Sequence, residues 1–222
     1  MPVFFEILNI LAVGLTSFNA KLQVPTDIAT DNLYLPTQST SSQSTLDKIS
    51  NWTTENQMKL NSEKTKYLII NFCSSKQFQT RLYIDQSMIE QVRETQLLGV
   101  IISDDLTWHA NTKLITKKAN QRMIILRKLF EFKIADNDML QIYKLFIRSV
   151  LETSCVVWAT SITQEEIVSI ERVQKIALKI IYKEKYISYE NALNVSKMPS
   201  LSERRLNLTL KFAQKCTKNE KN

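Results

Sequence analysis

Few side chains in this sequence are of the types that carry out metal or nucleophilic chemistry. His109 is the only histidine, and the three cysteines, Cys73, Cys155 and Cys216, are far apart. A structural zinc site needs about four Cys or His ligands, so the sequence excludes zinc binding by these residues. A catalytic Ser-His-Asp or Cys-His arrangement would have to use His109, and no neighbouring residue supports one. An odd number of separated cysteines is typical of a protein from a reducing compartment.

Carboxylates and cations are the remaining candidates for chemistry. Asp104 and Asp105 are adjacent acids, of the type that can hold divalent metal ions. Gly14 and Gly99 are the only glycines. They are too far apart to form a glycine-rich phosphate loop, so enzymes of the Walker or dinucleotide-binding type are excluded.

Positive charge is concentrated in the second half of the chain. Residues 1–112 carry 8 Lys/Arg against 11 Asp/Glu, a net −3, whereas residues 113–222 carry 21 against 11, a net +10. Four cations in that half recur at helical spacing, at i, i+3, i+7 and i+11: Arg172, Lys175, Lys179 and Lys183. Such a stripe can follow the phosphates of a nucleic acid. An ordinary solvated helix face can have the same pattern, and both readings stay open here.

The elements that would position these residues differ between the two halves. The first half predicts a small α+β unit. Its expected parts are an apolar helix or strand at 4–13, an extended segment at 20–36, a polar linker at 37–45, a helix from Ser44 to about Gln57, a strand at 67–73, a hairpin at 81–90 turning at Asp85-Gln86-Ser87, and a strand at 97–102.

From His109 onward the apolar period is helical, which predicts four or five helices. Thr163 with Glu166, and Ser200 with Glu203, are spaced as capping boxes at the starts of two of them. The expected inward faces are Ala119, Met123, Leu126 and Phe130; Met139, Tyr143, Phe146 and Val150; Ile167, Ile170, Val173 or Gln174, Ala177 and Ile180; and Leu206, Leu210 and Ala213. Trp158 is expected to be buried against the second of these faces.

A series of short motifs occurs in a specific order. Residues 46–52 read Leu-Asp-Lys-Ile-Ser-Asn-Trp, residues 56–66 read Asn-x-Met-x-Leu-Asn-x-x-Lys-Thr-Lys, and residues 98–109 read Leu-Gly-Val-Ile-Ile-Ser-Asp-Asp-Leu-Thr-Trp-His. This order resembles the downstream half of the palm in reverse transcriptases of non-LTR (LINE- or jockey-like) retrotransposons. Seven clusters that are similar to the helical region after that palm follow in order, at 117–119, 142–143, 148–152, 157–158, 171–181, 188–193 and 200–205.

The resemblance implies an α+β fold: an incomplete palm remnant with a short antiparallel sheet, followed by a thumb-like α-helical bundle. It divides the chain into a degenerate palm remnant and polar linker (1–43), a late palm-like unit with a primer-grip-like hairpin (44–112), and a basic thumb-like region (113–222). It also implies an RNA-directed DNA polymerase, a nucleotidyltransferase that in its intact form uses Mg²⁺.

The catalytic carboxylates of the family are poorly matched in this chain. Residues 21–30 lie where the family has an aromatic-x-Asp-Asp box, and only Asp27 stands for one aspartate of that pair. Two metal ions about 4 Å apart need that pair and a third carboxylate from an earlier strand. Asp104 and Asp105 fall at a turn of the family, so a solvated turn is expected for them. A truncated, catalytically inactive fragment without catalytic residues, metal or cofactor of its own is therefore expected.

The resemblance also assigns roles to residues outside the catalytic centre. Lys64 aligns with a palm lysine near the phosphates of the incoming nucleotide, although a surface lysine explains it as well. Leu98, Gly99 and Val100 look like the hairpin that supports the primer end, where Gly99 serves either close approach to a ligand or a β-bulge. The expected nucleic-acid-binding set is Lys117, Lys118, Arg122, Arg172, Lys175, Lys179, Lys183, Arg204 and Arg205.

The remaining expectations concern location and alternative roles. Residues 1–15 are apolar, but no Lys or Arg precedes Lys21, and the run is shorter than the roughly 20 residues that cross a bilayer. An intracellular protein, cytoplasmic or nuclear and not secreted, with no membrane partner, is expected, with its oligomeric state open. The expected partner is RNA, DNA or a hybrid. The alternatives are a non-enzymatic nucleic-acid-binding or helical interaction protein derived from such a fragment, and a degraded reading frame.

Overall fold

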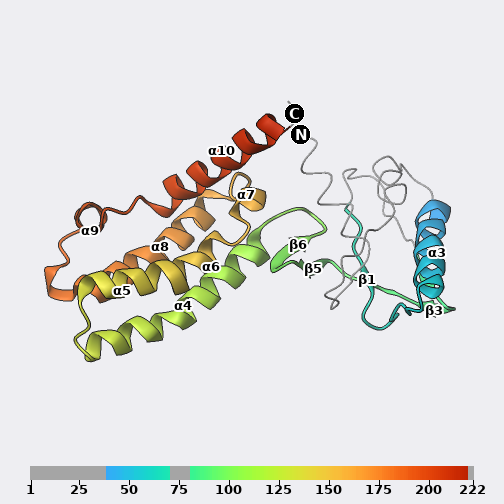
Figure 1. The fold of residues 1–222 in the computed structure, drawn as a ribbon, viewed down its shortest axis with the longest axis horizontal. Coiled ribbons are helices and arrows are strands. Elements are labelled where there is room, and N and C mark those ends of the chain that lie inside the picture. The colour runs from blue at the N-terminus through green and yellow to red at the C-terminus, as the bar shows by residue number, and fades with distance from the viewer. Residues whose placement is uncertain (1–38, 71–80, 220–222) are drawn as a thin grey trace. The chain divides into compact units, whose positions relative to one another are not determined.

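The computed structural model describes residues 39–70 and 81–219, which form two compact units (Figure 1). Of the described residues, one unit contains 39–70, 81–97 and 103–106, and the other contains 98–102 and 107–219. The boundary passes through one β-hairpin. Helices and short two-stranded sheets together place the described chain in the α+β class.

The first unit is built on α3, Ser39–Glu55. Leu46 of this helix packs in a small core with Leu60, Ile84 and Ile89. Residues 39–45 were expected to belong to a polar linker, with Ser44 as the N-cap of the helix. That prediction is wrong, because these residues form the first turns of α3. Tertiary contact accounts for the difference. The Gln43 side chain holds both backbone groups of Tyr83, at 2.9 Å each.

The strands of this unit are short. β1, Lys66–Tyr67, pairs in parallel with β4, Glu90–Gln91, and a 2.8 Å ion pair joins Lys66 to Glu90. The predicted strand at 67–73 is therefore not formed at 68–70, and residues 71–73 lie outside the described residues. The hairpin expected at 81–90 is confirmed: β2, Tyr83–Ile84, is antiparallel to β3, Ser87–Met88.

Two-residue turns with positive φ close both hairpins. Asp85 and Gln86 have φ values of 46° and 67°, the sign that a type I′ turn requires at both central positions. β5, Glu94–Leu97, and β6, Val100–Ser103, flank Leu98 and Gly99, whose φ values are 47° and 89°. The single strand predicted at 97–102 is wrong, since its second and third residues make this turn.

The second unit is a bundle in which α8 packs against α4, α5, α9 and α10. After β6 its helices follow one another with short connections (Figure 1). They are α4 His109–Glu131, α5 Asp136–Ile142, the π-helix η3 Tyr143–Arg148, α6 Ser149–Glu152, α7 Cys155–Trp158, α8 Gln164–Tyr182, the 3₁₀ helix η4 Lys183–Lys185, α9 Tyr189–Ser196 and α10 Leu201–Asn219.

On α4, Ala119, Met123 and Leu126 are buried as predicted, whereas Phe130 is half-buried. The face that follows it is only partly right. Met139 and Tyr143 are buried, but Phe146 is 51% exposed and Val150 is half-buried. Ile147 and Leu151 take the core positions. The cause is η3, because a π-helix has more residues per turn than an α-helix. The buried positions Tyr143, Ile147 and Leu151 are therefore each four residues apart.

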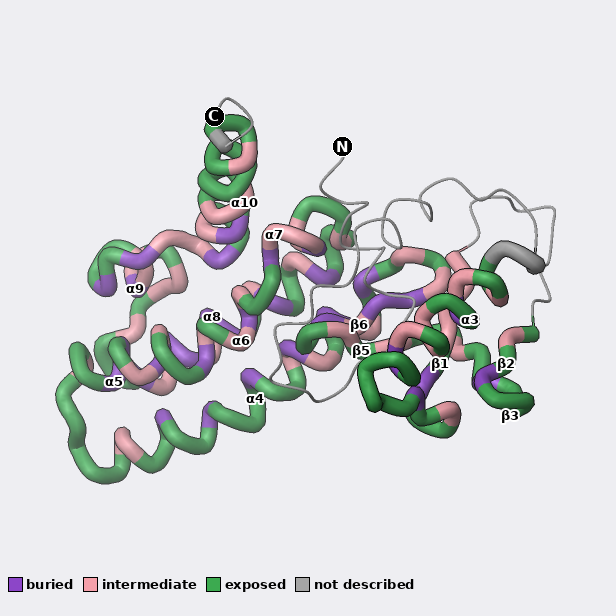
Figure 2. Tube along the Cα trace, turned by 45° about the vertical axis from the view of Figure 1, so that its right-hand side comes forward, coloured by how far each residue is buried: buried purple, intermediate pink, exposed green. Residues whose placement is uncertain are grey.

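α10 differs most from the prediction. Leu206 and Leu210 are 55% and 51% exposed, and Ala213 is exposed as well. Burial is concentrated in the first turns of the helix, at Leu201 and Arg205, and the far end is largely exposed (Figure 2). On α8, by contrast, Ile170, Val173, Gln174 and Ala177 are buried as expected, whereas Ile167 and Ile180 are half-buried.

Within residues 39–70 and 81–219, none of the helices combines the length and the apolar character that a membrane span requires.

Candidate nucleic-acid interface

The start of α8 is fixed by the carboxylate of Glu166. Glu166 accepts hydrogen bonds from the backbone N–H of Thr163 at 2.7 Å and from the hydroxyl of Thr112 at 2.9 Å. The Glu166 N–H donates to the Thr163 hydroxyl at 3.3 Å, which completes the predicted capping box. Because Thr112 lies in the first turn of α4, the box also ties α8 to that helix.

The middle of α8 is fixed by a buried amide. Tyr143 of η3 donates its hydroxyl to Oε1 of Gln174 at 2.7 Å. The Gln174 amide donates to the Tyr189 hydroxyl at 3.0 Å and to the Pro199 carbonyl at 3.1 Å. Burial raises the pKa of Tyr143 well above its ordinary value, so its hydroxyl keeps the proton that it donates. One side chain therefore joins η3, α8, α9 and the segment before α10.

Glu171 connects α8 to the start of α10. Its carboxylate accepts the N–H groups of Leu201 and Ser202, at 3.1 and 3.2 Å, and the hydroxyl of Tyr189. A negative charge stabilises the N-terminus of a helix. Burial, with help from Glu171, raises the pKa of Tyr189. The Ser200 capping box is only half seen, because Ser200 accepts from Glu203 N–H at 3.1 Å and no reciprocal bond is found in the described part of the chain.

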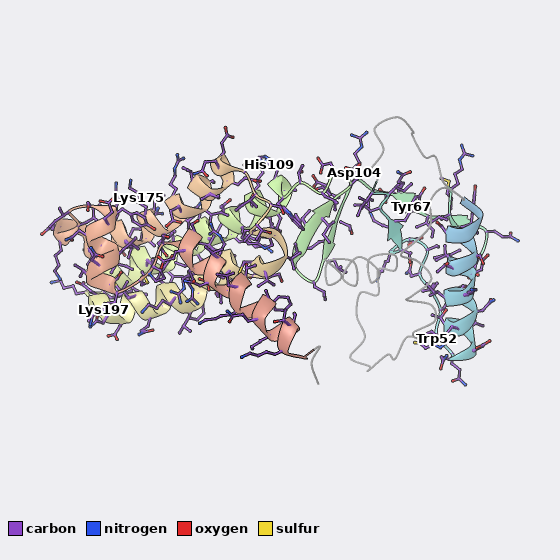
Figure 3. The ribbon with its side chains drawn as sticks, turned by 90° about the horizontal axis from the view of Figure 1, so that it is seen from above. Trp52, Tyr67, Asp104, His109, Lys175 and Lys197 are labelled. Carbon is purple, nitrogen blue, oxygen red and sulfur yellow. The ribbon has the colours of Figure 1, made fainter. Side chains whose placement is uncertain are left out.

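These contacts hold one side of α8 inside and leave a row of cations outside. Arg172, Lys175 and Lys179 are all exposed. Their spacing of three and four residues keeps them on one side of the helix. Lys175 lies at the outer edge of its unit (Figure 3). Among the residues that the structure describes, neither Arg172 nor Lys175 forms an ion pair with a carboxylate. We call these three residues the α8 stripe.

Lys183 is exposed but leaves the helical row. It is the C-cap of α8, with φ 40°, and its ammonium lies 4.6 Å from the centre of the Phe130 ring. Lys179 has a similar contact, 5.5 Å from the ring of Tyr186. Cations over aromatic faces are attracted by the ring quadrupole. The fourth position of the predicted stripe is therefore set by the end of the helix and not by its period.

The expected cations of α4 are exposed. Lys117 and Lys118 face solvent, and Arg122 is also exposed. Arg122 donates to the carbonyl oxygen of Phe146 at 2.5 Å, so part of its hydrogen-bonding capacity is used within the bundle. A guanidinium has five donors, so Arg122 can make this bond and still present other donors to solvent.

Arg204 and Arg205 were expected in the nucleic-acid-binding set, but Arg204 is half-buried and Arg205 is buried. Arg205 is buried, with its guanidinium 6.0 Å from the centre of the Trp158 ring. Burial lowers the pKa of Arg205. Arg204 is paired with Glu152, which also pairs with Arg148 at 3.3 Å. The structure thus gives Arg205 a role in packing and Arg204 a role in an ion-pair cluster.

The first unit presents the other predicted residues. Lys64 is exposed in a turn, where the side-chain oxygen of Asn61 accepts the N–H groups of Glu63 and Lys64 at 3.0 and 3.1 Å. Leu98 is 84% exposed at the hairpin tip, and Val100 is buried. A Cβ on Gly99 would meet no described atom within 4 Å. The positive φ of the turn is one reason for a glycine at this position.

Catalytic chemistry finds little support among the described residues. Asp104 and Asp105 lie in a turn, as expected, with Asp105 exposed. Within residues 39–70 and 81–219, no three His, Cys, Asp or Glu side chains gather to hold a metal ion. Burial raises the pKa of Cys155, which disfavours the nucleophilic thiolate. Asp27 and Cys73 lie outside the described residues.

The arrangement is suited to binding a polyanion, because a rigid helix presents cations at regular spacing to solvent. Sequence reasoning located the α8 stripe but missed the Gln174 network that fixes it. The sequence signal that could have indicated this network is Gln174 itself, a glutamine on an otherwise apolar helix face. Comparison with protein families, curated proteins and solved structures found no match to this chain.

Proposed function

We propose that this chain is the C-terminal part of a non-LTR retrotransposon reverse transcriptase, and that its helical region binds nucleic acid without polymerising it. The observation that carries the proposal is the α8 stripe. Arg172, Lys175 and Lys179 are exposed on one side of a helix whose opposite side is fixed at its start and middle by Glu166 and Gln174.

The binding physics follows from charge. Cations that contact phosphates release condensed counterions, which favours association at low salt and depends little on base sequence. The net +10 of residues 113–222 supplies a long-range attraction for any polyanion. Weak, sequence-tolerant binding that falls steeply with salt is the expected behaviour.

The lineage rests on the order of the motifs in residues 44–217. The β5–β6 turn at Leu98 and Gly99, at the position where the resemblance implies a primer-supporting hairpin, adds support.

Exposed apolar side chains on α10 are the other observation that bears on function. Leu206 and Leu210 on α10 favour the second candidate, a helical interaction protein. A sedimentation measurement in which the pair of changes Leu206→Glu and Leu210→Glu reduces self-association would support that candidate.

The described residues do not fit the magnesium ions of the intact family. Two-metal catalysis needs a carboxylate pair with a third carboxylate near it. Asp104 and Asp105 lie in a turn, and no third acidic ligand joins them among residues 39–70 and 81–219. No step of polymerisation is therefore assigned to this chain.

Polymerase activity is expected to be absent. Purified protein should not extend a primed RNA template in Mg²⁺ or Mn²⁺, because several kcal/mol of transition-state charge stabilisation would be lacking. A gel-based extension assay measures this directly. Extension that Asp104→Ala or Asp105→Ala abolishes would contradict both the inactivity and the interpretation of the turn.

The α8 stripe is expected to carry much of the binding. Replacing Arg172, Lys175 and Lys179 with glutamine should weaken binding to a labelled RNA–DNA hybrid at low salt by about tenfold or more. Fluorescence anisotropy provides the affinity, and circular dichroism checks the fold. The matched control replaces three exposed cations of the first unit, Lys48, Lys59 and Arg93. Equal losses of affinity for both variants would show that binding depends on net charge alone and not on the α8 stripe.

A further inference from the structure

The helical unit contains an open hollow at one end of its bundle. It has a volume of about 1240 Å³. It is lined by the end of α4, the connection from α4 to α5, the last turns of α8, η4 and one residue of α9. These segments come together at the end where α4 turns into α5 (Figure 1). Specific ligand sites of small molecules are commonly about 300–1,000 Å³, so the hollow has room for a ligand of at least that class.

Two kinds of surface line the hollow. Its apolar part includes Phe130, Ile134, Ile176 and Ile180. Its charged part contains five cations, Arg127, Lys133, Lys179, Lys183 and Lys185, and two acids, Glu131 and Asp136. Asp136 is already paired with Lys185 at 2.7 Å. The excess of positive charge over an apolar lining is complementary to a ligand that combines an anion with a flat apolar group.

Lys179 and Lys183 give the hollow its continuity with the α8 stripe. Both line it, and each holds its ammonium over an aromatic ring, of Tyr186 and Phe130 respectively. A nucleic-acid strand whose phosphates contact Arg172 and then Lys175 along α8 would next reach Lys179 and the hollow. The outer pair, Arg172 and Lys175, does not line the hollow. α8 and its C-cap therefore carry two pairs of cations: Lys179 and Lys183 line the hollow, and Arg172 and Lys175 lie outside it.

We infer that this hollow accepts unpaired nucleotides of a single-stranded nucleic acid, an inference that rests on the proposed function and names its ligand class. Single-strand sites combine cations along the backbone with surfaces on which bases stack. In a duplex the faces of the bases are covered by their neighbours, so the apolar lining would have nothing to contact. A single strand offers both its phosphates and its base faces.

The test compares two variants that each remove two positive charges from α8 and its C-cap. The hollow variant is Lys179→Gln with Lys183→Gln, and the outer variant is Arg172→Gln with Lys175→Gln. The probes are a labelled single strand of about 16 nucleotides and its blunt duplex. Because the lost charge is equal, both variants should weaken duplex binding alike. The hollow variant should weaken single-strand binding about fivefold more than the outer variant, the effect expected for one lost base contact.

The apolar lining is tested separately. Ile134→Glu should weaken single-strand binding and leave duplex binding close to that of its control, Ile124→Glu. Both isoleucines are exposed enough to tolerate the change, at 37% and 57%, and Ile124 does not line the hollow. Adenosine monophosphate should also displace the single strand at a lower concentration than inorganic phosphate does. Equal displacement by both would show that only phosphate is recognised and would overturn the inference.

The outcomes separate the inference from the proposed function. If the hollow and outer variants weaken both probes equally, the stripe binds phosphates, the hollow binds no base, and the inference fails alone. If neither variant weakens either probe, the proposed function and the inference fail together. Circular dichroism and thermal melting of each variant confirm that the compared proteins are folded.

Discussion

Replacing Trp158 with alanine is expected to lower the free energy of unfolding by about 3–5 kcal/mol. The indole is fully buried, and its N–H donates to the carbonyl oxygen of Thr153 at 2.9 Å. The guanidinium of Arg205 lies against the same ring. Truncation would leave a cavity, an unpaired carbonyl and a buried cation that has lost its aromatic contact. These losses occur together, which places the expected effect among the largest for this chain.

Urea titration followed by circular dichroism measures the Trp158 effect. Trp52→Ala is a suitable control, because Trp52 is half-buried on α3 in the other unit. Its loss should be clearly smaller. A loss under about 1 kcal/mol for Trp158→Ala would show that the ring is exposed, and the packing of α7 against α10 would then be wrong.

Gln174→Met is expected to lower the free energy of unfolding by about 2–4 kcal/mol. Methionine is similar to glutamine in size, so the change removes the hydrogen bonds but little volume. The change leaves the Tyr143 hydroxyl and the Pro199 carbonyl without the partners that Gln174 provides. Each buried polar group left unsatisfied costs about 1–3 kcal/mol. Gln164→Met is the matched control, because Gln164 is exposed at the first position of α8. That control should change the stability by less than about 0.5 kcal/mol.

A double-mutant cycle with Tyr143→Phe tests the hydrogen bond itself. Removing both partners should cost less than the sum of the two single changes, because neither is then left unsatisfied. The coupling should be at least about 0.5 kcal/mol. Simple additivity of the two single losses would contradict the contact between Tyr143 and Gln174.

Helical periodicity predicted the parts of the fold in which the backbone is regular. It located most of the inner faces of α4 and α8, because 3.6 residues per turn hold over their whole length. It failed at η3, where a π-helix moved the core position from Phe146 to Ile147. It also failed on α10, because an apolar stripe does not reveal that Leu206 and Leu210 extend past the packed part of the bundle.

The candidate site was predicted in part for the same reason. The period of α8 gave Arg172, Lys175 and Lys179, which depend on local structure alone. Arg205 was misassigned because burial under a tryptophan is a tertiary fact. The partners of Gln174 lie 31, 15 and 25 residues away, so no local pattern announces them. The hollow likewise depends on where the end of α4, the start of α5 and the end of α8 meet.

The salt dependence of binding tests the central claim most directly. The logarithm of the affinity for a nucleic acid should fall linearly with the logarithm of salt concentration, by close to one unit of slope per phosphate contact. Replacing Arg172, Lys175 and Lys179 with glutamine should reduce the slope by about two to three units. The control that replaces Lys48, Lys59 and Arg93 in the first unit should leave the slope unchanged. A slope that stays the same in the stripe variant would contradict the claim that α8 contacts phosphates.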